Sequence, residues 1–171
     1  MEKIFSVKDV QEIDCSQTWT TKANATLRVL TTDPFPALFC PSSGFFLYDP
    51  GELQIAKGFE MRGLRTYTVR CQNPGVLGGT EFHRIRWEYV IGLEGRFEWT
   101  FEDLHGEKKV SVISPTNGIL LPPFILHTSE AKVKNSGLLV ICNTLYDPEK
   151  KETHDTYSKE MFRKAQKRLF N

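Results

Sequence analysis

The sequence lacks any apolar run near the roughly 20 residues that cross a bilayer. Acidic residues interrupt its first segment, where a signal peptide needs a continuous apolar stretch. It also lacks a net charge of either sign, because 22 basic side chains are balanced by 21 acidic ones. A nucleic-acid-binding protein normally carries a basic face. These absences predict a cytoplasmic protein that binds neither a membrane nor a nucleic acid.

Cysteine is scarce, and Cys15, Cys40, Cys71 and Cys142 form no C-x-x-C pair. Their spacing indicates neither a zinc knuckle nor a dense disulfide framework, so we expect buried thiols. The 171 residues, 40% of them hydrophobic, are enough to enclose one core without such cross-links. The sequence therefore predicts one self-supporting domain.

Short segments of alternating apolar and polar residues dominate the middle of the chain. Residues 65–70, 97–101 and 109–113 alternate as half-buried strands do. Residues 87–93 and 137–143 are more continuously apolar and indicate strands that are buried more deeply. Turn signals rich in Gly, Pro and Asn separate these segments. Strands at such short intervals predict an all-β sandwich or barrel.

The N-terminal part of the chain differs from this pattern. We expect residues 1–45 to form an extension that precedes a barrel over residues 46–148. A capping-box pattern from Ser6 to Asp9 predicts a short helix in the extension. One strand is predicted there as well, over residues 26–31.

The C-terminal part, residues 149–171, is predicted to form a helix. Tyr157, Met161, Ala165 and Leu169 recur at every fourth position, which places them on one helical face.

Several residues whose side chains could take part in catalysis or metal binding lie between Gly75 and Gly95. Glu81 and His83 are two positions apart, so on a strand both side chains would leave the same face. Glu88 follows, and His127 comes directly after a proline-stiffened apolar run. Carboxylates and imidazoles are the groups that proteins use for proton transfer and for metal binding.

These residues resemble the two sequence motifs of the cupins. The first cupin motif, G-x5-H-x-H-x4-E-x6-G, is met with Glu81 in place of its first histidine, and His83 and Glu88 stand at their expected places. The second, P-x-G-x2-H, is met at Pro122 and His127, with Phe124 in place of its glycine. The resemblance implies a jelly-roll barrel, in agreement with the alternating segments.

Within the cupins, the sequence is more similar to the sugar 3,4-ketoisomerases of the WxcM-like family, over about residues 47–162. The segments that carry this similarity are Asp49–Leu53, Arg65–Tyr67, Gly75–Arg84, Leu121–His127 and Asp155–Tyr157. The resemblance implies an isomerase that acts on a nucleotide-linked (dTDP-type) 4-keto-6-deoxy sugar through an enediol. It also implies a homodimer without a cofactor.

The sequence departs from that family at positions close to the chemistry. Glu81 replaces the first histidine of the family's H-A-H segment, Leu77 replaces an arginine, and Glu88 replaces a glutamine that many members carry. The resemblance leaves His83 as the main base, which suits an imidazole because its ordinary pKa is near neutrality. Glu81 would be its partner.

Other residues are expected to line the substrate pocket. Arg65, Arg84 and Arg86 would hold the diphosphate by bidentate hydrogen bonds. Tyr67 or Trp87 would stack on the base or the sugar, and His127 matches a pocket-wall histidine of the family.

Two alternative functions remain open. Glu81, His83, Glu88 and His127 occupy the four positions at which metal-binding cupins hold their ion, and this set suits Fe(II), Mn(II) or Zn(II). The chain would then be an oxygenase or an isomerase of another small molecule. The third possibility is a cupin that binds a sugar without catalysis.

Several side chains are expected to have no chemical role. His105 lies in a turn and His154 in a charged tail, so both are predicted to be solvent-exposed. Phe97 and Trp99 are predicted to belong to the core.

Overall fold

The structure is a computed structural model. It describes residues 4–16, 18–20, 26–28, 45–48, 55–59, 65–144, 146, 149 and 154–169. Cys40 and the segment Asp49–Leu53, which contributed to the family resemblance, lie outside the described residues. The predicted boundaries at residues 45 and 148 remain predictions.

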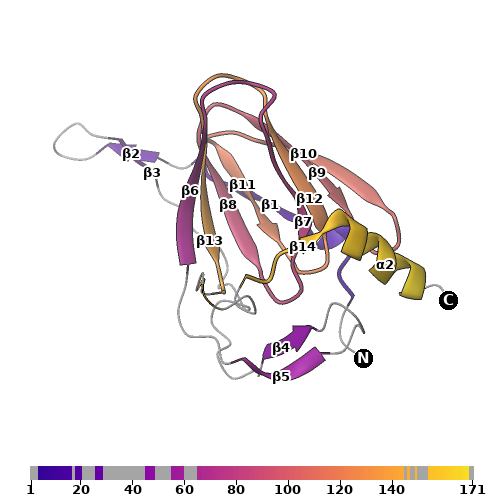
Figure 1. Ribbon diagram of the computed structural model, residues 1–171. Coiled ribbons are helices and arrows are strands. Elements are labelled where there is room, and N and C mark those ends of the chain that lie inside the picture. The colour runs from indigo at the N-terminus through magenta and orange to yellow at the C-terminus, as the bar shows by residue number, and fades with distance from the viewer. Residues whose placement is uncertain are drawn as a thin grey trace.

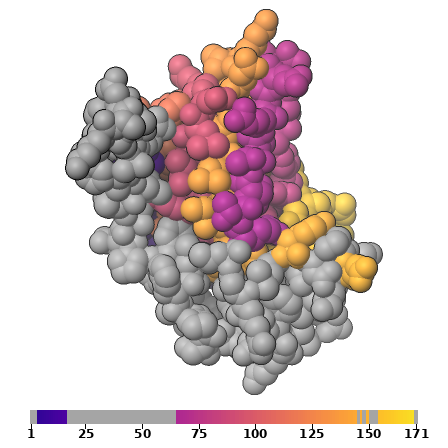
Figure 2. Space-filling view, turned by 90° about the vertical axis from the view of Figure 1, so that its left-hand side faces the viewer, coloured from indigo at the N-terminus to yellow at the C-terminus, as the bar shows by residue number. Residues whose placement is uncertain are grey.

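Two five-stranded antiparallel sheets form the body of the molecule. In spatial order, the first sheet contains β1 (Gln11–Asp14), β11 (Asn117–Leu121), β8 (Glu88–Glu94), β13 (Ser136–Cys142) and β6 (Arg65–Cys71). The second contains β10 (Lys108–Ile113), β9 (Phe97–Glu102), β12 (Leu126–Ala131), β7 (Leu77–Phe82) and β14 (Tyr157–Ser158). Figure 1 shows the sheets facing each other, and Figure 2 shows β6 and β13 side by side on one wall. This is the all-β jelly-roll architecture that the sequence predicts.

Shorter elements accompany the two sheets. A one-turn helix, η1 (Val7–Asp9), begins after Ser6 with the predicted capping box. Two hairpins follow in sequence, and a helix lies near the C-terminus: β2 (Thr18–Thr20) with β3 (Thr26–Arg28), β4 (Phe45–Tyr48) with β5 (Ile55–Phe59), and α2 (Lys159–Leu169). In the described parts of the chain, no helix is long and apolar enough to cross a membrane.

The N-terminal segment belongs to the first sheet. Strand β1 pairs antiparallel with β11, and Gln11 lies opposite Leu120. The amide of Val7 donates a hydrogen bond to the buried carboxylate of Asp103, 3.0 Å away. Because the start of the chain supplies an edge strand, it covers backbone that would otherwise be an unpaired sheet edge.

The core lies between the inner faces of the two sheets. Phe97, Trp99 and Phe101 alternate along β9 and are all buried, so the prediction that this stripe belongs to the core is confirmed. Leu138 and Val140 of β13 pack in the same cluster. Apolar and polar residues alternate in this way along a strand that has one face in the core and the other exposed to solvent.

Two of the predicted strands are displaced by one residue. β8 begins at Glu88 and β13 at Ser136, whereas the apolar runs predicted residues 87–93 and 137–143. Trp87 falls outside β8 because its amide donates to the side-chain oxygen of Asn143, 2.8 Å away. The Trp87 amide therefore bonds to a side chain, while its carbonyl still accepts from the Asn143 amide over 3.4 Å.

The C-terminal helix begins later than the sequence predicts. Tyr157 lies in β14, opposite Phe82 of β7, so its backbone is not helical. The buried residues of α2 are Phe162 and Ala165, which pack beside Phe82. Leu169 is 39% exposed, so the predicted apolar face was wrong at both of its ends.

Candidate functional site

His83 lies in the loop that directly follows β7, and its side chain is only 2% exposed. The Nδ1 atom is 2.6 Å from the backbone carbonyl of Asp155. A carbonyl oxygen can only accept a hydrogen bond, so Nδ1 carries the proton and Nε2 is the basic nitrogen of the neutral ring. On the side that faces Glu88, this Nε2 atom lies 3.4 Å from Nη1 of Arg86, which can only donate and so also favours an unprotonated Nε2.

His127 lies on β12 and is 4% exposed. Its Nδ1 is 3.0 Å from the carbonyl of Ile125, so this ring too presents Nε2 as its basic nitrogen. The ring centroids of His83 and His127 are 5.1 Å apart. Burial, together with the charge of a protonated His83, lowers the pKa of His127 to about 4. His127 is therefore a neutral imidazole at physiological pH.

Glu88, the first residue of β8, lies between the two imidazoles. Its Oε1 is 3.5 Å from Nε2 of His83, and its Oε2 is 3.9 Å from Nε2 of His127. Burial alone would raise the pKa of this carboxyl, but His83, His127 and Arg86 outweigh it and lower the pKa below the ordinary value. The site therefore contains a buried carboxylate.

Two further side chains donate to the same carboxylate. The Tyr67 hydroxyl donates to Oε1 over 3.1 Å, and Arg86 Nη1 is 3.3 Å from that oxygen. Burial, followed by the charge of Glu88, raises the pKa of the Tyr67 hydroxyl, so the hydroxyl keeps its proton. A buried anion needs such donors, because isolated charge in a protein interior is strongly unfavourable.

Glu81 lies opposite His127 in the pairing of β7 with β12. One ligand atom from each of Glu81, His83 and His127 lies within 4.8 Å of the other two. The structure thus brings together the acid, the first imidazole and the later imidazole that the sequence singled out. Their chemistry fits a divalent cation, because both histidines offer Nε2 while a backbone carbonyl orients Nδ1.

Arg86 is held from several sides by the protein itself. Its Nε donates to the Thr144 hydroxyl over 3.2 Å, and Nη2 donates to the carbonyl of His154 and, over 3.2 Å, to the Thr156 hydroxyl. The prediction placed this guanidinium on the diphosphate. The structure instead places it inside the buried network, beside Glu88.

The other two predicted arginines stack on aromatic rings. The guanidinium carbon of Arg84 is 4.8 Å from the centre of the Phe124 ring. That of Arg65 is 5.3 Å from the Tyr67 ring and 5.5 Å from the Tyr146 ring. Arginine can stack on a ring and still hydrogen-bond at its edge, so both positions suit an anionic ligand.

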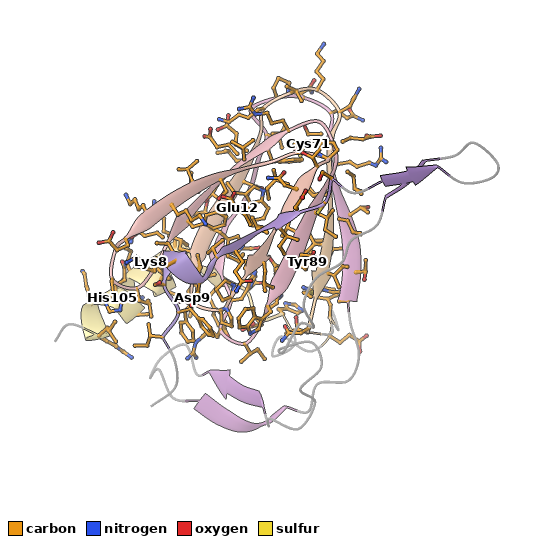
Figure 3. All side chains as sticks on the ribbon, turned by 180° about the vertical axis from the view of Figure 1, so that it is seen from behind. Lys8, Asp9, Glu12, Cys71, Tyr89 and His105 are labelled. Carbon is orange, nitrogen blue, oxygen red and sulfur yellow. The ribbon has the colours of Figure 1, made fainter. Side chains whose placement is uncertain are left out.

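The two histidines outside the motifs differ from each other. His105 is exposed, as predicted, and Figure 3 shows it away from the barrel interior. His154 is half-buried, so its predicted exposure was wrong. It is stacked on Tyr146 with 4.8 Å between ring centres. The cause is tertiary, because the tail folds back against the barrel.

A surface hollow of about 590 Å³ lies away from this site. Arg70, Cys71 and Glu94 line it with three neighbours, and Arg70 pairs with Glu94 across 3.5 Å. Cys71 lies toward one end of the barrel and Tyr89, the neighbour of Glu88, toward the other (Figure 3). The hollow therefore belongs to the turns at the far end.

Sequence reasoning missed the site role of Asp155. Its carbonyl contacts His83 from 72 residues away along the chain. One relevant signal was present, because Asp155–Tyr157 was among the segments that resemble the family. That resemblance did not indicate which residue Asp155 contacts.

Comparison with known families gives the following result. A family model described as "WxcM-like, C-terminal" matches residues 53–162. The chain belongs to the WxcM-like family. The resemblance inferred from the motifs is thereby confirmed. A search of curated proteins finds no match.

Several solved structures share the fold of this WxcM-like chain. A sugar 3,4-ketoisomerase, QdtA, from Thermoanaerobacterium thermosaccharolyticum in complex with TDP has a TM-score of 0.64 and 15% identity, over 96% of this chain and 99% of that one. WlaRA, a TDP-fucose-3,4-ketoisomerase from Campylobacter jejuni, has a TM-score of 0.63 and 18% identity, over 95% of this chain and 99% of that one. A 3,4-ketoisomerase from Helicobacter canadensis has a TM-score of 0.61 and 14% identity, over 92% of this chain and 97% of that one.

Proposed function

We propose that this protein is an isomerase of nucleotide-linked sugars. In detail, it would move the carbonyl of a dTDP-type 4-keto-6-deoxy sugar from C4 to C3. Membership of the WxcM-like family supports this proposal, as does the shared fold with proteins named as sugar 3,4-ketoisomerases. The observation that carries it is the pair of buried imidazoles, His83 and His127, whose basic nitrogens both face Glu88.

The reaction would proceed by proton transfer through an enediol. His83 Nε2 takes the proton from C3 while O4 gains one. A proton is then returned to C4 as O3 loses its own, so that no oxidant or reductant is consumed. The carboxylate of Glu88, 3.5 Å from His83 Nε2, stabilises the imidazolium that forms. Glu81, beside His83, would transfer the hydroxyl protons that O4 gains and O3 loses.

Substrate binding would use the remaining predicted residues. Arg65 and Arg84 would bind the diphosphate, and Tyr67 and His127 would line the pocket. Arg86 would act from within the network by holding Glu88 in place, 3.3 Å away. The homodimer and the cytoplasmic location remain predictions.

The test is the His83→Asn variant with a dTDP-linked 4-keto-6-deoxy sugar as substrate. We expect turnover, followed by NMR of the product, to fall at least about 100-fold, because general-base catalysis contributes that much. The affinity for thymidine diphosphate should stay within about threefold, since the base does not hold the nucleotide. The matched control is His105→Asn, at an exposed histidine, which should leave both quantities unchanged.

Two results would contradict the proposal. Turnover that survives in His83→Asn would remove His83 as the base. Binding of the nucleotide sugar by the unmodified protein without any product would support the third function, a cupin that binds a sugar without catalysis.

The second candidate function is a metal-dependent cupin enzyme. The observation in its favour is the cluster of Glu81, His83 and His127, with ligand atoms within 4.8 Å of one another and Glu88 adjacent. A bound Fe(II), Mn(II) or Zn(II) would act as a Lewis acid toward a substrate oxygen. The protein residues would orient that oxygen and exclude water.

Metal analysis of the protein purified without added ions separates the two candidates. The metal-dependent function requires about one equivalent per chain, and Glu81→Gln should lower this content. The control Glu160→Gln, on the exposed face of α2, should leave it unchanged. A metal content near zero that stays so after incubation with each of the three ions would exclude this candidate.

A further inference from the structure

Asp155 lies against the loop that carries His83. Its carboxylate accepts hydrogen bonds from three successive backbone amides of that loop: Arg84 at 3.1 Å, Ile85 at 3.0 Å and Arg86 at 2.7 Å. Successive amides that point to one side form a concave anion-binding site. Here the anion is a side chain from a distant part of the chain.

The same residue also contacts the imidazole. The backbone carbonyl of Asp155 accepts the Nδ1 proton of His83 over 2.6 Å. Asp155 thus holds the loop through its carboxylate and the ring through its carbonyl. The backbone φ of Asp155 is +39°, in the left-handed region. Aspartate tolerates that region better than most residues do, and the hydrogen bonds maintain it here.

The residues on either side of Asp155 hold Arg86. The carbonyl of His154 and the hydroxyl of Thr156 both accept from its Nη2. Arg86 in turn donates to Glu88. Residues 154–156 therefore hold both the imidazole of His83 and the guanidinium of Arg86.

We infer that Asp155 is a positioning residue, which fixes His83 in the tautomer that presents Nε2 to the reacting atoms. The inference deepens the proposed function and rests on it for its catalytic meaning. The tautomer itself does not depend on that function. A carboxylate bound to three amides orients the Asp155 carbonyl, and the carbonyl then selects Nδ1 as the protonated nitrogen.

Asp103 offers a matched control within the same chain. It is also buried, and its carboxylate also accepts from three backbone amides: Val7, His105 and Glu107, each at 3.0 Å. Its carboxylate bonds to the N-terminal segment and to a turn, and it stabilises both of them. Asp155→Asn and Asp103→Asn therefore remove the same kind of interaction at two places.

The first measurement is the tautomer of His83, read from two-bond ¹H–¹⁵N correlations in the full chain labelled at histidine. Spectra are recorded at about pH 8.5, about two units above the ordinary imidazole pKa. We expect the unmodified protein to carry the His83 proton on Nδ1, Asp155→Asn to show a mixture or the other tautomer, and Asp103→Asn to match the unmodified protein.

The second measurement separates positioning from simple stability. Asp155→Asn should lower kcat at least about tenfold, as loss of an orienting partner commonly does, while KM stays within about threefold. Asp103→Asn should unfold at a lower denaturant concentration but keep kcat. If Asp155→Asn does not fold, Asp155→Gly replaces it, because glycine adopts a positive φ readily.

Three outcomes would overturn the inference. The first is an unmodified protein with the His83 proton on Nε2. The second is a folded Asp155 variant with an unchanged tautomer, and the third is an equal loss of kcat in the Asp103 variant. If the unmodified protein turns over no nucleotide sugar, the proposed function fails, and the tautomer measurement still decides the inference.

Discussion

The buried carboxylate of Glu88 is the residue around which the site is built. It is 3% exposed and has Arg86, Tyr67 and two imidazoles as neighbours. A charged group in a protein interior is tolerated when such partners satisfy its oxygens, and removal of one partner is costly. Each partner is therefore expected to contribute measurably to stability as well as to chemistry.

The hydroxyl of Tyr67 provides a test at this scale. Tyr67→Phe removes the hydrogen bond to Glu88 Oε1, so we expect the free energy of unfolding to fall by about 1–2 kcal/mol. The control is Tyr146→Phe, at a residue that is 55% exposed, and it should have little effect. Urea denaturation of both variants measures the difference. Equal losses would show that the Tyr67 hydroxyl bond contributes nothing specific.

At the scale of elements, α2 is attached to the second sheet through Glu102 of β9. Both terminal nitrogens of Arg163, Nη1 and Nη2, contact this carboxylate, and Nη2 is 2.8 Å from Oε2. Gln166 donates to Glu102 over 3.1 Å and to the carbonyl of Asp103 over 3.0 Å. The hydrogen bond from Arg163 lowers the pKa of Glu102 below its ordinary value.

This pKa shift predicts an acid dependence of stability. The unfolded chain, with the ordinary glutamate pKa, takes up the proton before the folded protein does. The pair of Glu102 with Arg163 therefore adds to the free energy of unfolding above the ordinary glutamate pKa. This stabilisation is lost as the pH falls from the ordinary pKa toward the lower pKa of the folded protein. We expect Glu102→Gln to be less stable than the unmodified protein by about 0.5–1 kcal/mol near pH 7, because the pair is only partly buried.

The comparison is made by urea denaturation at several pH values. The difference between Glu102→Gln and the unmodified protein should shrink steadily as the pH falls below the ordinary glutamate pKa of about 4.3. Glu160→Gln is the control, since Glu160 pairs with Lys164 across 3.0 Å on an exposed face. A gap that persists in acid, or an equal loss in Glu160→Gln, would refute this account.

At the scale of the whole molecule, the site is formed where distant segments meet. Glu81 comes from the end of β7, His83 from the loop directly after it, Glu88 from the start of β8, and His127 from β12. Strand β8 belongs to one sheet, whereas β7 and β12 belong to the other. Their meeting is a property of the closed two-sheet fold, and the tail at Asp155 completes it.

Much of the site was predictable because it follows local spacing. The two-residue period of a strand predicted that Glu81 and His83 lie together, and they do, although His83 lies in the loop just after β7. The motif spacing also indicated Glu88 and His127. The environment of Arg86 was not predictable in this way. Its partners His154 and Thr156 lie 68 and 70 residues away along the chain, and no local pattern reports such a contact.

The sequence alone determined the all-β class and the candidate acids and imidazoles, because side-chain alternation and motif spacing are short-range properties that any strand expresses. Only the tertiary structure decided three other features: the start of α2 at Lys159, the inward position of Arg86 and the contact of Asp155 with His83. Each depends on backbone hydrogen bonds or buried charges between segments that approach only after the sheets have closed.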